Sequence, residues 1–214
     1  MTAGTARADE RAGYLISLSG IDGSGKSSLA ERLCRALQRA GRIARIVRTM
    51  RRDPAFVTTV SSLELPPAAG EDWKLAREEF LASYLSWTLA VNAAEIVCPA
   101  LARGEVVICD RYRADHHVSQ AWFGVDISGH HPILATMPQP DVAFLVDCDP
   151  AVAQRRIDTR GAAGAGTGRD FLRYSREGFL RWFDDHPHVR LDGTLDPRTV
   201  LDEASAHVAP LVRQ

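Results

Sequence analysis

A glycine-rich segment near the N-terminus has the residue types and spacing with the clearest chemistry. Gly20 and Gly25 are followed by Lys26 and Ser27, which fits the pattern GxxxxGK[ST] at each fixed position. The glycines let successive backbone N–H groups converge on phosphate oxygens, and the lysine ammonium reaches the outer phosphates. The serine hydroxyl is a suitable magnesium ligand. The segment therefore predicts binding of a nucleoside triphosphate with Mg²⁺ by Gly20, Asp22, Gly23, Ser24, Gly25, Lys26, Ser27 and Ser28.

An acid and an arginine follow an apolar run further along the chain. Asp110 and Arg111 come directly after Glu105–Cys109, which predicts a strand. Ligand sites in open α/β sheets lie at the carboxyl ends of strands, so we expect this pair to face the phosphate-binding segment. Asp110 can hold Mg²⁺ or polarise an acceptor, and Arg111 can clamp a second phosphate. A structural ion pair that caps the strand is the alternative, and Asp147, at the end of another predicted strand, is a second candidate metal ligand.

Two arginines near residue 160 are candidates for a role at the transferring phosphoryl group. Arg156 and Arg160 are four residues apart and project from one face of a helix. The glycine-rich segment Gly161–Gly168 follows them, and no regular element favours that composition. We therefore predict a mobile lid at about residues 155–170, whose closure excludes water and brings Arg156 or Arg160 onto the phosphoryl group. The alternative is a solvated basic helix end that the helix dipole favours.

Short apolar runs and helical patterns alternate along the rest of the chain. The runs predict strands at residues 14–19, 42–47, 105–109, 141–147 and 188–191. Helices are expected at residues 29–37, 71–101, 150–160 and 171–183, and from Pro197 onward. Pro99 is expected to kink or restart the long helix. The pattern predicts a single α/β domain over residues 14–214, with a five-stranded parallel sheet covered by helices on both faces, after a disordered tail at residues 1–13.

Composition narrows the class of partner to small molecules. The 214 residues have a net charge of −1, without the basic surface that a nucleic acid or an anionic membrane requires. We expect neither a signal peptide nor a membrane-spanning segment. The four cysteines form no CxxC pair, which favours buried thiols in a reducing cytoplasm. The pairs His116-His117 and His130-His131 lack companion ligands for a metal and are expected in loops or on the surface.

Several segments in order resemble the thymidylate kinases, a family of P-loop nucleoside monophosphate kinases. The resemblance rests on GIDGSGKSS (20–28), CPALARGEVVICDRY (98–112), AFLVDCDPAVAQRRIDTRG (143–161) and FLRYSREGFLRWF (171–183). It implies the P-loop kinase fold and a transfer from ATP, with Mg²⁺, to a nucleoside monophosphate. It also implies a homodimer formed through the long helix.

The resemblance implies a role for several single residues. The phosphate-binding segment would hold the donor and its magnesium, while Asp22 would contact the acceptor sugar. Asp110 would serve the metal or the acceptor. Arg111 would bind the acceptor phosphate, and so would Arg51 in the basic loop after the second strand. Because positions 23 and 24 hold no arginine, the catalytic arginine would come from the lid.

The expected acceptor pocket departs from the family pattern. Leu85 and Leu89 stand where the family has an aromatic that stacks on thymine and an arginine that contacts the base. Ser119 and Gln120 stand where the family has a Tyr-Gln pair. A leucine cannot donate to a pyrimidine carbonyl, so these residues predict a different nucleotide or nucleotide-like acceptor. The alternative is that the base is contacted from a shifted position by Trp87, Asn92, Trp122 or His116.

Two other functions compete with this one. A kinase of an unphosphorylated nucleoside or another small alcohol would need a base near the acceptor hydroxyl, and Asp110 or Asp53 could serve. A regulatory GTPase or a mechanical ATPase would hydrolyse the nucleotide without an acceptor. The Asn-Lys-x-Asp guanine reader of GTPases is absent, because Ala93 follows Asn92, the only asparagine. Measured turnover without an acceptor would separate these classes.

Overall fold

The computed structural model describes residues 12–50, 70–161 and 168–212. The strands are β1 (Tyr14–Ser19), β2 (Ala44–Val47), β3 (Val106–Asp110), β4 (Val142–Asp147) and β5 (Val189–Asp192). The helices are α1 (Lys26–Arg39), α3 (Gly70–Asn92), the π-helix η2 (Ala93–Val97), α4 (Cys98–Ala102), α5 (Arg113–Trp122), the 3₁₀ helix η3 (Ile127–His130), α6 (His131–Ala135), α7 (Pro150–Thr159), α8 (Arg169–Asp184) and α9 (Pro197–Val212). The predictions for Arg51, for residues 1–11 of the tail and for residues 162–167 of the lid lie outside the described residues.

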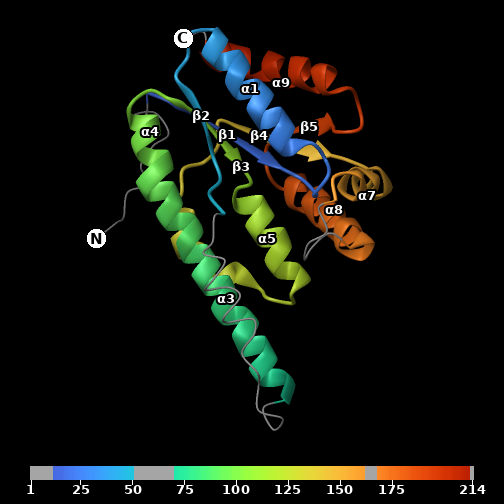
Figure 1. Cartoon of the computed structure of the whole chain (residues 1–214). Helices are drawn as coiled ribbons and strands as arrows, with labels where there is room; N and C mark the ends of the chain where they lie inside the picture. The colour runs from blue at the N-terminus through green and yellow to red at the C-terminus, as the bar shows by residue number, and fades with distance from the viewer. Residues whose placement is uncertain (1–11, 51–69, 162–167, 213–214) are drawn as a thin grey trace, which may run out of the picture.

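The predicted parallel sheet is confirmed. Its five strands follow the order β2-β3-β1-β4-β5, and each described pairing is parallel. Leu18 of β1 is in register with Asp110 of β3, so the ends of these two strands lie side by side. The chain leaves β1 toward α1 on one face and leaves β3 toward α5 on the other (Figure 1). A ligand crevice is expected where neighbouring strands lead to opposite faces.

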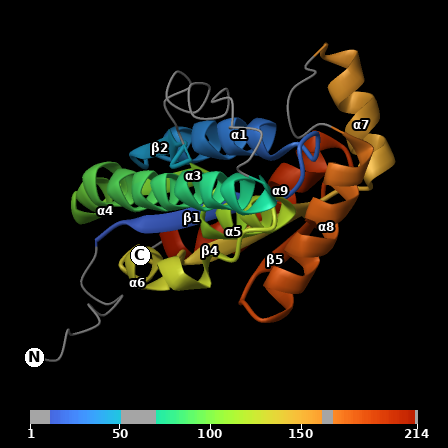
Figure 2. The ribbon, with the colours of Figure 1, turned by 90° about the horizontal axis from the view of Figure 1, so that it is seen from below.

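Helices cover both faces of the sheet, as predicted. α1 packs beside α9 on one face, and their core residues meet Ile16, Ile108 and Phe144 of the strands. On the other face lie the long helix formed by α3 and α4, and the helices α5, α6 and α8. α7 and α8 lie at the opposite side of the molecule from α4 in both views (Figures 1 and 2).

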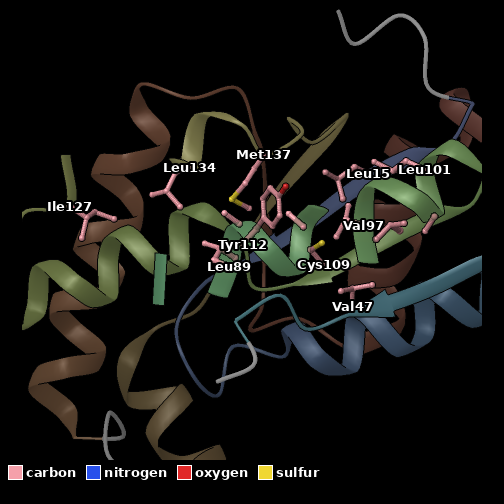
Figure 3. Packing of buried hydrophobic residues seen from close by; sticks show 14 of the residues in the cluster. Leu15, Val47, Leu89, Val97, Leu101, Cys109, Tyr112, Ile127, Leu134 and Met137 are labelled. Carbon is pink, nitrogen blue, oxygen red and sulfur yellow. The ribbon is translucent and has the colours of Figure 1, made fainter. Parts of the chain in front are cut away.

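The core under the long helix consists of closely packed aliphatic and aromatic side chains (Figure 3). Leu15 and Cys109 from the sheet pack in one cluster with Leu89 and Val97 of the long helix. Tyr112, just after β3, belongs to the same cluster, and its hydroxyl donates to the Pro138 carbonyl at 2.9 Å. The residues after β3 are therefore held by the core below them.

The long helix is confirmed, with corrections to its detail. The π turn Ala93–Val97 ends two residues before Pro99, whose ring lacks an N–H donor and crowds the turn before it. Phe80 is 55% exposed, whereas Leu81 and Leu89 of the same helix are buried. Among the described residues, Lys74–Ala102 is long and apolar enough to cross a membrane by length and composition alone, and 39% of its most apolar window is buried. Core helices of soluble proteins meet the same criteria, so this helix does not overturn the expectation of no membrane-spanning segment.

Two arginines enclose the carboxylate at the end of β4. Arg176 of α8 donates from Nε and Nη2 to Asp147 at 2.7 and 3.0 Å, and Arg190 of β5 donates at 2.6 Å. The hydrogen bond from Arg176, supported by the one from Arg190, holds the pKa of Asp147 below its ordinary value. Asp147 therefore joins α8 to the sheet, which leaves Asp110 as the candidate metal ligand of the two.

We expect Asp147→Asn to lower the free energy of unfolding at pH 7 by roughly 1–2 kcal/mol, because both arginines lose an anionic partner but remain partly exposed. The folded-state pKa is depressed, so this stabilisation is complete above the unfolded pKa of about 4 and is lost as the pH falls through the lower folded value. Urea unfolding at pH 7 and at pH 3 checks this, with the exposed Asp202→Asn as control. If Asp147→Asn lowers the free energy of unfolding by the same amount at both pH values, the stabilisation does not come from the charge of Asp147, which would contradict its role as an ion-pair partner.

Candidate active site

The glycine-rich segment forms a tight turn between β1 and α1. Gly20, Gly23 and Gly25 have φ angles of 140°, 81° and 102°, a region that side chains with a Cβ disfavour. A Cβ on Gly20 would lie 2.4 Å from the Val146 carbonyl oxygen, so only glycine fits against β4. The turn leads directly into α1, whose first residue is Lys26. Backbone N–H groups at a helix N-terminus after such a turn form a phosphate site.

Lys26 is almost completely buried at the centre of the site. It is 4% exposed, and its ammonium donates to the Ile21 carbonyl oxygen at 2.7 Å. Burial, followed by the charge of Arg111, lowers the pKa of Lys26 to about 8. A buried ammonium with one carbonyl acceptor retains donor capacity for an anion, because it has three N–H groups.

A hydrogen bond joins Ser27, in the first turn of α1, to Asp110 at the end of β3. The Ser27 hydroxyl donates to Oδ2 of Asp110 at 2.8 Å, and Arg48 Nε lies 3.7 Å from the same oxygen. A hydroxyl and one carboxylate, completed by phosphate oxygens and water, match the way Mg²⁺ binds with a nucleotide. Within the described residues no group of three or more His, Cys, Asp or Glu side chains could form a separate metal cage. The donor set therefore fits a nucleotide-bound Mg²⁺.

Arg111 lies between the phosphate-binding segment and α5. Its φ is 76°, and its N–H donates to the Leu18 carbonyl oxygen at 3.0 Å while its own carbonyl accepts from Thr49 Oγ1 at 2.9 Å. The guanidinium donates from Nη2 to Asp22 and from Nη1 to Oδ1 of Asp115 at 3.2 Å. The fold therefore brings together Asp22 and Arg111, which are 89 positions apart in the sequence.

The two predicted lid arginines have different surroundings. Arg156 Nη1 donates to the Gly193 carbonyl oxygen at 2.7 Å and to that of Gly23 at 3.3 Å. It thus joins α7 to the phosphate-binding turn and to the turn after β5. Arg160 is exposed at the end of α7, and within the described chain its Nε donates to the Arg156 carbonyl oxygen at 3.1 Å. Of the two guanidinium groups, that of Arg156 is the one held by the fold.

Two cavities lie on either side of the Ser27–Ser28 peptide. One, of about 560 Å³, is lined by Ser28 together with Gly23, Arg156, Gly193 and Pro197, among others. The other, of about 910 Å³, is lined by Ser27 together with Asp110, Arg111, Arg48, Met50 and Asn92, among others. Both volumes suit small-molecule ligands. The arrangement provides two compartments, each bordered by a different set of residues of α1.

Comparison with known proteins identifies the family. The family model of thymidylate kinase matches residues 18–204. A thymidylate kinase of Solidesulfovibrio magneticus is 34% identical over 169 residues, covering 76% of this chain and 77% of that protein. A thymidylate kinase of Xanthomonas oryzae pv. oryzae is 33% identical over 195 residues, covering 91% and 82%. The chain belongs to the thymidylate kinase family. It is therefore a nucleoside monophosphate kinase, an enzyme that transfers a phosphoryl group from ATP.

In this member of the thymidylate kinase family, four residues that were predicted to contact the acceptor do not line the larger cavity. Leu89 is 1% exposed and packs in the core, and Leu85 is half-buried on the same helix. The Ser119 hydroxyl donates to the His116 carbonyl oxygen at 3.0 Å, and the buried Gln120 donates to Ser119 at 3.4 Å. These four residues line neither cavity.

The prediction that His116 lies in a loop or on the surface is wrong. His116 is completely buried in α5, with Nε2 2.8 Å from Ser86 Oγ of α3. His117 is half-buried on the same helix, and its ring centroid lies 4.5 Å from that of Trp182. Adjacent helical residues differ by about 100° in direction, and here one points to α3 and the other to α8.

Sequence analysis missed Asp115 as a site residue. Asp115 is 2% exposed and accepts hydrogen bonds from Ser19, Tyr112 and Arg111. The available signal was an acid three residues after Tyr112, at the start of a helix, which is typical of helix capping. That signal predicts a solvated cap, not a buried carboxylate beside the phosphate-binding residues.

Proposed function

We propose that this enzyme transfers the terminal phosphoryl group of Mg²⁺-ATP to a nucleoside monophosphate in an acceptor pocket that differs from that of thymidylate kinases. The observation that carries the proposal is that the phosphate-binding segment borders two cavities. Ser28 lines the smaller cavity, whereas Ser27, Asp110 and Arg111 line the larger one. Two bound anions need fixed cations between them, and Lys26 and Arg111 supply these.

The donor nucleotide is assigned to the smaller cavity. Its phosphates would accept hydrogen bonds from the turn at Gly23–Ser28 and from the Lys26 ammonium, while Val152 and Pro197 offer apolar contact to the nucleoside. Ser27 and Asp110 would hold Mg²⁺, which supplies positive charge to the phosphate oxygens when bound. Lys26 neutralises the charge that develops as the phosphoryl group departs.

The acceptor is assigned to the larger cavity. Arg48 and Arg111 line it, and these cations favour an acceptor that already has a phosphate over a free nucleoside or alcohol. Asp22 stays a candidate for contact with the acceptor sugar, because it lies 39% exposed beside Arg111.

The altered base contact is assigned to Asn92. Of the four residues considered for a shifted base contact, Asn92 lines the cavity beside Asp110 and Arg111. Its Nδ2 donates to the Thr49 carbonyl oxygen at 2.8 Å, which orients the amide, and Met50 and Ile96 provide apolar walls. Trp87 is exposed on the outer face of α3, whereas Trp122 packs edge-on against Phe171 and Tyr174. An amide in place of a guanidinium changes which base edges can be recognised.

A panel of acceptors tests the proposal. ADP release from ATP and Mg²⁺ is measured with dTMP, dUMP, UMP, CMP, dCMP, AMP and GMP, with the free nucleosides, and without an acceptor. We expect the highest kcat/KM for a monophosphate other than dTMP, and little release with any nucleoside. Highest kcat/KM for dTMP would contradict the altered pocket, and preference for a nucleoside would favour the alcohol kinase instead.

We further propose that the enzyme is a cytoplasmic homodimer formed through the outer face of α3. Phe80, Trp87 and Val91 recur at helical spacing on this face and are 55%, 61% and 38% exposed. Burying such a stripe against a second copy removes apolar surface from water. The four cysteines form no disulfide with one another, which is typical of a reducing compartment.

Trp87→Glu is expected to convert the dimer to a monomer at micromolar concentration, because it places a charge at the centre of an apolar contact. Light scattering after size-exclusion chromatography measures the mass. Phe123→Glu changes an aromatic of similar exposure on a different segment, so it is the matched control and leaves the mass unchanged. A monomeric unsubstituted protein, or an unaltered Trp87→Glu dimer, would contradict this interface.

A further inference from the structure

Asp115 is a buried carboxylate that joins three parts of the active site. Its Oδ2 accepts from the Ser19 hydroxyl at 2.6 Å, at the end of β1, and from the Tyr112 N–H at 3.1 Å. Its Oδ1 accepts from Arg111 Nη1 at 3.2 Å. The residue is 2% exposed, and the first turn of α5 fixes its backbone. Asp115 therefore has little freedom to move away from Arg111.

The two carboxylates on Arg111 differ in their freedom. Asp115 is buried, whereas Asp22 is 39% exposed and lies in the phosphate-binding turn. Burial raises the pKa of Asp115, while the charges of Arg111 and Lys26 oppose that effect. A buried carboxylate is costly without partners, so Asp115 and Arg111 hold one another in place.

Acceptor binding makes a specific demand on Arg111. A phosphate that is bound by two hydrogen bonds needs two N–H groups in the plane of the guanidinium. Asp22 and Asp115 accept hydrogen bonds from different Nη atoms of Arg111. A phosphate can therefore replace Asp22 on its side of the guanidinium while the contact with Asp115 persists. The backbone of Arg111 is fixed at both its N–H and its carbonyl, so only the side chain needs orientation.

We propose that Asp115 is a positioning residue that orients Arg111 toward the acceptor phosphate, and that Asp22 occupies the other side of the guanidinium until that phosphate replaces it. The inference rests on the proposed function and deepens it. It predicts that loss of the Asp115 charge weakens the acceptor complex and leaves the ATP complex intact, because Arg111 lines the larger cavity and not the smaller one.

Asp115→Asn tests the role, because asparagine keeps the size and can still accept a hydrogen bond from Tyr112 or Ser19. We expect the KM for the best monophosphate to rise about tenfold or more, as for a lost hydrogen bond to a charged group. The affinity for ATP, titrated with a fluorescent ATP analogue without acceptor, stays within about twofold. Ser19→Ala is the matched control, since it removes the 2.6 Å hydrogen bond but keeps the Arg111 ion pair, and its acceptor KM stays near normal.

A double-mutant cycle shows whether Asp115 acts through Arg111. In an Arg111→Lys background, Asp115→Asn should change acceptor kcat/KM by less than about threefold, because the oriented guanidinium is already gone. An unchanged acceptor KM in Asp115→Asn, an equal rise in the KM values for ATP and acceptor, or the same effect in both backgrounds would overturn the inference while leaving the proposed function standing. If the unsubstituted enzyme shows no acceptor-dependent turnover with any monophosphate, the proposed function fails and the inference falls with it.

Discussion

Lys26→Met is expected to lower kcat/KM for phosphoryl transfer by about a thousandfold or more, because it removes the buried cation nearest the transferring group. Lys26 is the one lysine of the phosphate-binding turn, and it directly precedes Ser27 and Ser28, which line the larger and the smaller cavity respectively. The charge that develops on the phosphate oxygens would then lose the ammonium and meet an apolar side chain at position 26. Such a loss cannot be recovered from solvent, because the site around residue 26 is buried.

The same substitution should leave the fold intact. Methionine matches the length of the lysine stem, and the lowered pKa of Lys26 shows that burial disfavours its charge. We therefore expect a midpoint of thermal unfolding equal to or above that of the unsubstituted protein. Coupled ADP release measures the activity, and Arg35→Met, which removes an exposed cation paired with Glu31, is the control with normal turnover. A Lys26→Met enzyme with more than a tenth of normal turnover would contradict the assignment of this site.

Arg160→Ala is expected to lower kcat about a thousandfold, as for loss of a catalytic arginine, while ATP affinity changes by less than about threefold. Arg160 is exposed at the end of α7, so its guanidinium is available to a bound phosphoryl group. The effect arises in the transition state, where charge on the phosphoryl oxygens is greatest.

Arg156→Ala is the matched comparison on the same helix face, and we expect the opposite pattern. Arg156 donates to the carbonyl oxygens of Gly23 and Gly193, which both line the smaller cavity. Its loss should raise the KM for ATP more than it lowers kcat, because the hydrogen bonds that hold α7 to the turns at Gly23 and Gly193 around the donor cavity are removed. Steady-state kinetics with varied ATP at saturating acceptor separates the two. If Arg156→Ala lowers kcat more than Arg160→Ala does, the roles are reversed.

Local sequence signals were sufficient for the fold and for the position of the glycine-rich turn beside Asp110 and Arg111. The turn at Gly20–Ser27 has a fixed spacing, and apolar runs with turn residues between them locate the five strands. The rule that ligands bind at the carboxyl ends of parallel strands placed Asp110 and Arg111 correctly beside that turn. These features depend on neighbours in sequence or on a general property of the sheet.

Features that depend on particular tertiary contacts could not be predicted. Asp110 and Asp147 both end a strand, and only the folded chain shows Arg176 and Arg190 on the second. Asp115 has the sequence signature of an exposed helix cap, but packing of α5 beside β1 buries it. On a long helix with apolar residues on two faces, the pattern did not decide that Leu81 is buried and Phe80 exposed.

Transfer of the γ-phosphoryl group of radiolabelled ATP tests the central claim most directly. The purified enzyme is incubated with Mg²⁺ and the best monophosphate of the panel, with the matching nucleoside and no acceptor as parallel reactions. We expect the label to appear in a nucleoside diphosphate, in amounts equal to the ADP formed, and to stay in ATP when the monophosphate is absent. Label released as inorganic phosphate at the same rate with and without acceptor would contradict the kinase and show a hydrolytic ATPase.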